Sequence, residues 1–458
     1  MLFHTWEFLV FFIVVYAVYL ALRPTKLWLP WLLVASYVFY GWWNPLYLIL
    51  VGYSTLLDYV CVIFMDRSRR RRLWLVISLV NNLALLGFFK YASFITDNLN
   101  QLLASIGIGY ALRGPDVLLP VGISFFTFQS MSYTIDFYRG QIERERNFVR
   151  FATFVSFFPQ LVAGPIERAR ELLPQFKTAP AIRRENLTNG ISLFITGLFK
   201  KIALASYLAN YADPIFANPS NYQSATLTLA VIAFAWQIYF DFSGYTDMAR
   251  GIAQMLGFRL MLNFNHPYLA TGLRDFWGRW HISLSTWFRD YVYIPLGGNR
   301  RGELQMYRNL FLTMVLSGLW HGAAWRFVIW GALHGIGILV TRSLEKSPWY
   351  RNKVPTLIKQ VAVFAFVCFA WIFFRAETTS DALLILNRIA TTGWNRPGFP
   401  LLCGLLVISI LVYQGLAELQ KLDSRVGRWI QFGCFIAMVL YLSLVPGESN
   451  NPFIYFQF

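Results

Sequence analysis

The chain contains few charged residues and little cysteine. Only 14% of its 458 residues are charged, whereas 57% are hydrophobic. A soluble domain carries charge on about a quarter of its residues, so this composition excludes an ordinary soluble enzyme. The cysteines lack CxxC spacing, which argues against a disulfide framework or a cysteine metal site and predicts buried structural thiols. They are Cys61, Cys368, Cys403 and Cys434.

The common nucleotide-binding and hydrolase motifs are also missing. The sequence has no GxxxxGK[ST] phosphate loop, no GxGxxG dinucleotide fingerprint, no HExxH zinc motif and no GxSxG nucleophile elbow. ATP-driven chemistry, dinucleotide redox chemistry and serine hydrolysis are therefore disfavoured. We expect neither a resident cofactor nor a metal ion.

Long uncharged runs are the main positive feature. Leu27–Leu57 has 31 residues without a charge, Val117–Ile135 has 19 and Pro214–Phe240 has 27. Because about 20 apolar residues span a bilayer, we predict an all-α polytopic integral membrane protein with roughly 10 to 12 hydrophobic helices. Phe8–Leu22 follows an acidic residue and precedes no small-residue cleavage site, so we interpret it as a retained helix rather than a signal peptide.

The runs follow one another without a soluble domain, a low-complexity linker or a convincing repeat. We therefore predict a single membrane-embedded domain over residues 1–458. Within it we distinguish a front helical bundle (1–110), a catalytic core (111–345) and C-terminal helices (346–458).

Basic residues outnumber acidic residues by 40 to 23, which gives a formal net charge of +17. They cluster in short loops such as Arg67–Arg72 and Arg300–Arg308. Short Lys/Arg-rich loops mark the cytoplasmic side of a membrane protein and contact anionic lipids. The charge therefore predicts membrane lipids, and not nucleic acid, as a partner.

Two segments differ from simple spanning helices. Val117–Ile135 contains Pro120, Gly122 and several hydroxyl residues, which suits a helix surrounded by protein or a cavity. Residues 260–308 interleave aromatic side chains with charges and contain the turn signal Pro295–Asn299. Such a segment is typical of short re-entrant or amphipathic helices.

Two Trp-His pairs are the candidates for chemistry. His321 lies in Leu310–Trp325, a stretch that otherwise carries no ionisable residue. An imidazole exchanges a proton near neutral pH, and an ionisable group in a membrane segment is a functional candidate. The alternative is a core histidine satisfied by a neighbour. His281 lies 40 residues earlier, where a carboxylate such as Asp275 or Asp290 could fix its tautomer.

The other histidines are weaker candidates. His334 is flanked by Gly331 and Gly335, a pattern that indicates close helix packing and a structural role. His266 precedes a proline in a loop, and His4 lies near the N-terminus. We assign no function to these three.

The chain resembles the membrane-bound O-acyltransferase family, most of all the bacterial branch that O-acetylates alginate, and more distantly the branch that D-alanylates teichoic acid. The resemblance extends over essentially the whole chain. It is carried by Ala163–Arg168 (AGPIER), Tyr239–Asp247 (YFDFSGYTD), Asp275–Arg300, Leu319–Gly322 (LWHG), the opening MLFHTWEFLVFF and the ending FIYFQF.

The resemblance implies a ring-like bundle around a funnel or tunnel, with re-entrant segments. His321 matches the family's catalytic histidine, and His281 matches its second, upstream histidine. An acyl group would pass from a cytoplasmic thioester, acetyl-CoA or an acyl carrier, to a hydroxyl outside the bacterial inner membrane. Partners would be extracytoplasmic polysaccharide acetyltransferase subunits, with an acyl carrier protein as a further candidate. Candidate donor-entrance residues are Arg289, Asp290, Asn299 and Arg300.

Two other functional classes are compatible with these residues. A transporter or flippase would also place polar groups in membrane helices, although we find no inverted repeat. A scaffold that only anchors extracytoplasmic enzymes is a third class. The acceptor polymer is not identified by the residues, and teichoic-acid D-alanyl transfer remains an alternative to acetylation.

Overall fold

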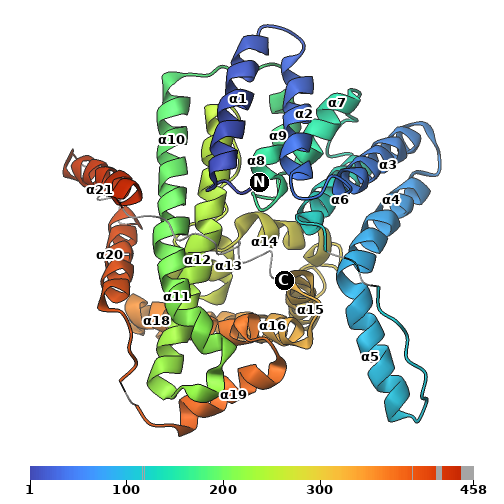
Figure 1. The fold of residues 1–458 in the computed structure, drawn as a ribbon. Helices are drawn as coiled ribbons and strands as arrows, with labels where there is room; N and C mark the ends of the chain where they lie inside the picture. Colours follow the sequence, from blue (N-terminus) through green and yellow to red (C-terminus); the bar gives the residue numbers. More distant parts are fainter. Residues whose placement is uncertain (116, 118, 395, 419–424, 445–458) are drawn as a thin grey trace. The chain divides into compact units, whose positions relative to one another are not determined.

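The computed structural model describes residues 1–115, 117, 119–394, 396–418 and 425–444. Within these ranges the chain is helical and contains no strand (Figure 1). In the described residues, eight helical segments are long and apolar enough to cross a membrane, and two shorter apolar helices, Trp6–Leu22 and Trp28–Gly41, precede them. The prediction of an all-α polytopic membrane protein is confirmed. The ending Phe453–Phe458, quoted for the family resemblance, lies outside the described residues.

The described residues divide into two compact units, the first within residues 1–191 and 249–261 and the second within 192–248 and 262–458. The first unit contains α1 (Trp6–Leu22), α2 (Trp28–Gly41), α3 (Tyr47–Arg67), α4 (Arg71–Leu86), the π-helix Gly87–Tyr91, α5 (Ala92–Ser105), α6 (Ile123–Tyr138), α7 (Phe148–Ser156), α8 (Phe158–Leu161), α9 (Ala169–Leu172) and the 3₁₀ turn Leu173–Phe176.

Two long helices belong to both units: α10 (Arg184–Phe199) and α12 (Ser224–Met255). The second unit further contains the π-helix Lys200–Ala205, α11 (Ser206–Ala217), the 3₁₀ turns Pro219–Asn221 and Pro267–Leu269, α13 (Leu273–Arg279), α14 (Ile282–Phe288), the π-helix Arg289–Tyr293, α15 (Glu303–His321), α16 (Trp325–Lys346), α17 (Pro348–Lys353), α18 (Thr356–Arg375), α19 (Thr379–Thr391), α20 (Leu401–Glu418) and α21 (Arg425–Leu444).

The uncharged runs do not map one-to-one onto helices. Phe8–Leu22 lies within α1 as predicted, but Leu27–Leu57 is divided between α2 and α3, and Pro214–Phe240 between α11 and α12. Both divisions lie at an Asn-Pro pair, Asn44-Pro45 and Asn218-Pro219. Proline lacks a backbone N–H and disfavours helix in the residue before it, so an apolar run can be divided without a charge.

Helix α6 contains most of the stretch Val117–Ile135, and it is enclosed by protein. The helix begins after Gly122, whose φ of 78° is left-handed and whose added Cβ would lie 2.8 Å from the Leu161 carbonyl oxygen. Nearly every side chain of α6 is buried. The prediction of a helix surrounded by protein is confirmed.

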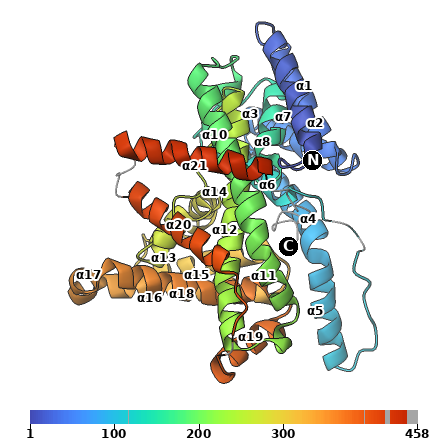
Figure 2. The ribbon, with the colours of Figure 1, turned by 60° about the vertical axis from the view of Figure 1, so that its left-hand side comes forward.

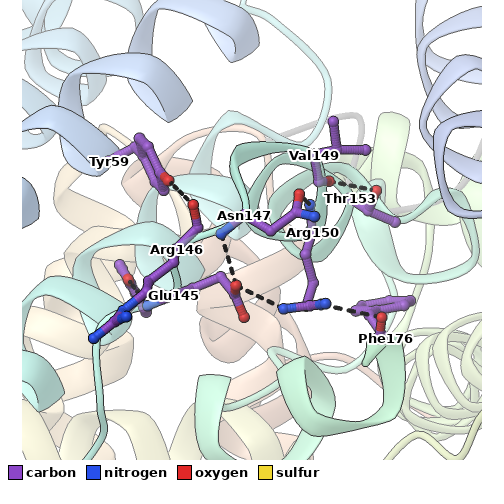
Figure 3. A network of polar contacts seen from close by, with 9 residues as sticks. Tyr59, Glu145, Arg146, Asn147, Val149, Arg150, Thr153 and Phe176 are labelled. Atoms are coloured by element: carbon purple, nitrogen blue, oxygen red, sulfur yellow. Dashed lines mark hydrogen bonds and ion pairs between the residues drawn. The ribbon is translucent and has the colours of Figure 1, made fainter. Parts of the chain in front are cut away.

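A polar network fixes the start of α7 in the first unit (Figure 3). The Asn147 side chain accepts a hydrogen bond from the Arg150 backbone N–H at 3.0 Å and so caps the helix. Arg150 forms an ion pair with Glu145 at 2.7 Å and donates to the Phe176 carbonyl at 3.1 Å. These contacts join α7 to the turn after α9.

The AGPIER stretch is a packed joint of the same unit. Gly164 lies so close to the backbone that an added Cβ would be 2.3 Å from the Cα of Gln160. Glu167 is buried and accepts a hydrogen bond from the Met261 N–H at 2.7 Å. Burial raises the pKa of the Glu167 carboxyl to about 7.

In the second unit, glycines allow the closest helix pairs. A Cβ on Gly318 would lie 2.2 Å from the Phe327 carbonyl oxygen, and one on Gly331 would lie 2.4 Å from that of Met314. Helices α15 and α16 therefore pack backbone against backbone, as the Gly331 pattern predicts. Figure 2 shows α16 and α18 side by side in this unit.

The prediction of buried thiols is confirmed for three cysteines and is wrong for the fourth. All four are free thiols, and Cys61, Cys368 and Cys403 are buried. Cys434 on α21 is exposed, so the prediction of a buried thiol is wrong there. An apolar run shows that a segment avoids water, but it does not distinguish cover by protein from cover by lipid.

Candidate active site

His281 occupies a strained joint between α13 and α14. Its φ of 42° lies in the left-handed region, which a non-glycine residue seldom adopts. Two backbone hydrogen bonds fix the joint: Ile282 N–H donates to the Asn263 carbonyl, and Asn265 N–H donates to the Arg279 carbonyl, both at 2.9 Å. The backbone conformation thus fixes the direction in which the imidazole points. Strained backbone of this kind is common at functional sites.

Asn263 determines the hydrogen-bonding state of His281. Its Oδ1 lies 3.1 Å from His281 Nδ1 and also accepts from the Ser283 N–H and hydroxyl, at 3.2 and 2.9 Å. Because an amide oxygen can only accept hydrogen bonds, we assign the His281 proton to Nδ1, and Nε2 then carries the lone pair. His281 lies outside the eight apolar segments, and burial lowers its pKa to about 3. The imidazole is therefore neutral at physiological pH.

This arrangement corrects the expected partner. We expected a carboxylate from Asp275 or Asp290 to orient His281, but the acceptor at Nδ1 is the Asn263 amide. Asp275 accepts a hydrogen bond from Arg279 at 2.8 Å, and Asp290 from Arg289 at 2.7 Å. An amide orients the ring without adding a buried negative charge.

His321 is the last residue of α15 and is 4% exposed. Its ring lies 5.0 Å from those of Trp320 and Trp330 and 5.3 Å from that of Phe374, between centroids. The Trp320 ring also lies 6.3 Å from His281. The structure therefore brings both candidate histidines, from separate elements, into one aromatic cluster with Trp320 between them.

Gly322 allows an aromatic wall to close on His321. A Cβ at Gly322 would lie 2.0 Å from the Phe327 ring. The Phe327 ring packs edge-on against Phe374, which in turn packs edge-on against His321. Arg326 lies 4.2 Å from the Phe327 centroid and donates to the Phe374 carbonyl at 2.6 Å. The glycine of the Trp-His-Gly stretch is thus required for the position of this wall.

Helix α12 forms a second wall, since the Phe242 ring lies 4.7 Å from that of His281, edge to face. The π-helix Lys200–Ala205 directs two consecutive lysines at α12, where Lys201 forms a buried ion pair with Asp241 and Lys200 pairs with Asp247 at 2.6 Å. Successive α-helical residues point about 100° apart, so the wider π turn lets both lysines reach one neighbouring helix.

The candidate donor-entrance residues lie on the segment after α14. Arg289 and Asp290 form an ion pair with each other, while Asn299 and Arg300 are exposed on the turn before α15. Buried Asn309 holds this turn by donating to the Leu296 and Gly298 carbonyls, both at 3.1 Å.

Comparison with known proteins identifies the family. The profile of the MBOAT, membrane-bound O-acyltransferase family, matches residues 141–378. This range contains His281, His321 and Asn263. The chain belongs to the membrane-bound O-acyltransferase family. It is accordingly a multi-pass membrane enzyme of the O-acyltransferase class.

Individual relatives extend the match. The chain is 39% identical to the probable alginate O-acetylase AlgI of Pseudomonas putida, over 93% of this chain and 94% of the relative. It is also 39% identical to the peptidoglycan O-acetyltransferase of Helicobacter pylori, over 78% and 72%. The teichoic acid D-alanyltransferase of Bacillus subtilis is 29% identical over 56% and 69%.

Asn263 and Asn309 are site residues that sequence reasoning missed. Each is a polar residue in a mixed segment, and neither has a motif of its own. Their importance comes from burial, since each is 1% exposed and hydrogen-bonded to elements distant in sequence. A pattern search detects Trp-His pairs but not the amide that orients one of them.

Replacement of Asn263 by alanine should disturb His281. The donors on His281 and Ser283 would lose a buried acceptor, each at about 1–3 kcal/mol. We expect a free energy of unfolding lower by roughly 3 kcal/mol and turnover reduced about tenfold or more. Exposed Asn265 is the matched control, and its alanine variant should behave as wild type. Equal stability and turnover in the two variants would contradict the assigned role.

The pH dependence of stability offers a second test. His281 has a folded-state pKa near 3 against a usual 6.5, so below pH 6.5 the unfolded chain binds the proton preferentially. This contribution to stability is complete above pH 6.5 and is lost as the pH falls towards 3, at about 1.4 kcal/mol per pH unit. His281→Asn, which tolerates the left-handed backbone, should show a smaller loss of thermal stability between pH 6.5 and 5. Parallel pH profiles for wild type and variant would refute the assignment.

Proposed function

We propose that the protein is an O-acetyltransferase that moves an acetyl group from a cytoplasmic thioester to a hydroxyl of a cell-surface polysaccharide or of a partner acetyltransferase. The family match and the named acetylases support this class. The proposal rests most on the placement of His321 and His281 in one aromatic cluster. Acetyl transfer is favoured over D-alanyl transfer because the acetylases are more similar and match more of the chain.

In the proposed reaction, His321 is the general base. Its ring nitrogen takes the proton of the acceptor hydroxyl as that oxygen attacks the thioester carbonyl carbon. The tetrahedral intermediate collapses, the carbon–sulfur bond breaks, and the departing thiolate takes the proton from the His321 imidazolium. The products are an ester and a free thiol. General-base catalysis contributes about 10²–10⁴-fold, and positioning supplies more.

The tautomer of His281 restricts the role that this residue can have in the reaction. With the proton on Nδ1 bound to Asn263, the neutral ring offers a lone pair at Nε2. A lone pair accepts a hydrogen bond and does not stabilise an oxyanion. We therefore assign His281 the role of orienting the donor or the acceptor, rather than that of stabilising an oxyanion.

The setting of this reaction follows from the same proposal. The enzyme would lie in the inner membrane of a bacterium, with no resident cofactor, and use acetyl-CoA or an acetylated carrier protein as substrate. Arg289, Asp290, Asn299 and Arg300 would face the donor. Extracytoplasmic acetyltransferase subunits would be its partners.

A donor and acceptor panel tests the proposed activity. Purified wild type would receive radiolabelled acetyl-CoA or acetylated carrier protein, with alginate oligomers, peptidoglycan fragments or no acceptor. We expect free thiol to appear together with ester-linked label on a polysaccharide. Transport of an intact substrate across a liposome membrane without thioester cleavage would contradict acyl transfer and would indicate a transporter.

A further inference from the structure

His334, on α16, is a buried imidazole that the fold does not satisfy. The residue is 0% exposed, and neither ring nitrogen has a hydrogen-bond partner among the described residues. Its neighbours are rings, with centroids at 4.7 Å for Trp330, 5.1 Å for Trp277, 5.7 Å for Phe366 and 6.1 Å for Phe276. A buried polar group without a partner destabilises the fold. A phenylalanine would fill the same space between these rings without this cost.

Three unsatisfied N–H donors lie in the same aromatic cluster. The indole Nε1 atoms of Trp277, Trp330 and Trp371 are buried and likewise have no hydrogen-bond partner in the described part of the chain. Trp330 contacts Trp277 edge-on at 5.7 Å and stacks on Trp371 at 5.9 Å. The cluster thus combines N–H donors with an imidazole that supplies a lone pair.

The cluster adjoins the proposed base. The Trp330 ring lies 4.7 Å from His334 and 5.0 Å from His321, so one indole separates the two imidazoles. The contacts come from α13, α15, α16 and α18, all within the second unit. A ligand whose thioester lies at His321 could therefore place a nearby polar group at His334.

We propose that His334 and the indole N–H groups of Trp277 and Trp330 bind an amide of the thioester donor's pantetheine arm. This inference rests on the proposed function. An amide presents one acceptor and one donor, which complement an indole N–H and an imidazole lone pair. In pantetheine thioesters the first amide nitrogen follows the sulfur after only two methylene groups. The arm is common to acetyl-CoA and acylated carrier proteins.

The predicted consequence is a preference for donors that carry this amide. The test compares acetyl-S-N-acetylcysteamine, which has the amide, with S-butyl thioacetate, which lacks it. Wild type should have a kcat/KM about 10- to 100-fold higher for the amide donor. His334→Phe should reduce this ratio by at least about fivefold, because kcat/KM falls more for the amide donor than for S-butyl thioacetate. His334→Gln, which can still hydrogen-bond, should retain part of the preference.

Stability separates a binding role from a structural one. Without donor, His334→Phe should have a thermal midpoint at or above that of wild type, because it removes an unsatisfied polar group. A midpoint lower by more than about 5 °C in both variants would show that the fold needs the imidazole and would overturn the inference. With acetyl-CoA and acetylated carrier protein as donors, equal losses of kcat/KM in His334→Phe would support binding of the arm that both donors share. If neither donor showed a loss, the inference would be contradicted.

The two proposals fail in different ways. If wild type cleaves both small thioesters and His334→Phe leaves their ratio unchanged, the amide site is wrong while acyl transfer stands. If His334→Phe lowers both rates equally, the residue acts on the reacting centre and the amide assignment is again wrong. If wild type cleaves no thioester, the proposed function fails and the amide site fails with it.

Discussion

Alanine at position 321 should abolish acyl transfer while the protein remains folded. Removal of a general base costs about 10²–10⁴-fold in rate, and His321 is the base in the proposed reaction. Because the side chain is buried among aromatic rings, the variant leaves a cavity and should also lose some stability. The measurement is thiol release from acetyl-CoA, with thermal unfolding followed on the same preparation.

A second histidine controls for loss of an imidazole as such. His266 lies in the same unit, precedes a short 3₁₀ turn and has the left-handed φ of 46° that asparagine tolerates. His266→Asn should therefore keep wild-type turnover. His321→Gln, which preserves more of the side-chain volume, should be as inactive as the alanine variant. Turnover in a folded His321→Ala protein within about twofold of wild type would exclude the base assignment.

Addition of a single methyl group at Gly322 should have the second largest effect. The new Cβ would lie 2.0 Å from the Phe327 ring, so the ring must move. Its displacement would propagate through Phe374 to His321, because the three rings pack in series. We expect Gly322→Ala to lower turnover by about 100-fold, the scale of a misplacement near 1 Å, and to lower stability by about 1–3 kcal/mol.

Gly278 on α13 provides the matched glycine. No atom lies within 4 Å of the position where its Cβ would be, and it precedes His281 by three residues. Gly278→Ala should retain turnover and gain slightly in stability, since alanine favours helix over glycine. If Gly322→Ala and Gly278→Ala have the same activity and thermal midpoint, the aromatic wall does not position His321.

The sequence predicts the class of fold well because hydrophobic length is a local property. The helical, membrane-spanning character is confirmed, and so are the buried α6 and the close packing at Gly331. Helix count and boundaries depend on Asn-Pro breaks and on helices too short to cross a membrane alone, such as α2. The ring-like bundle and the single domain remain predictions.

The site was only partly predictable, for a related reason. Trp-His pairs are visible as motifs, and His281 and His321 do share an aromatic cluster. The partner of His281 was predicted as a carboxylate and is Asn263, an amide 18 residues earlier in the sequence. Such a pairing depends on tertiary contacts that no local spacing encodes. His334 illustrates the same limit, because its unsatisfied nitrogens become visible only when its neighbours are placed.

The most direct test of acyl transfer across the membrane uses sealed liposomes. Wild type and His321→Ala would be reconstituted with acetyl-CoA labelled in the acetyl group outside and a polysaccharide acceptor in the lumen. Labelled ester in the lumen and free thiol outside, with wild type only, is the predicted result. Equal lumenal ester with both proteins, or lumenal label that is still thioester, would contradict a His321-centred acyltransferase.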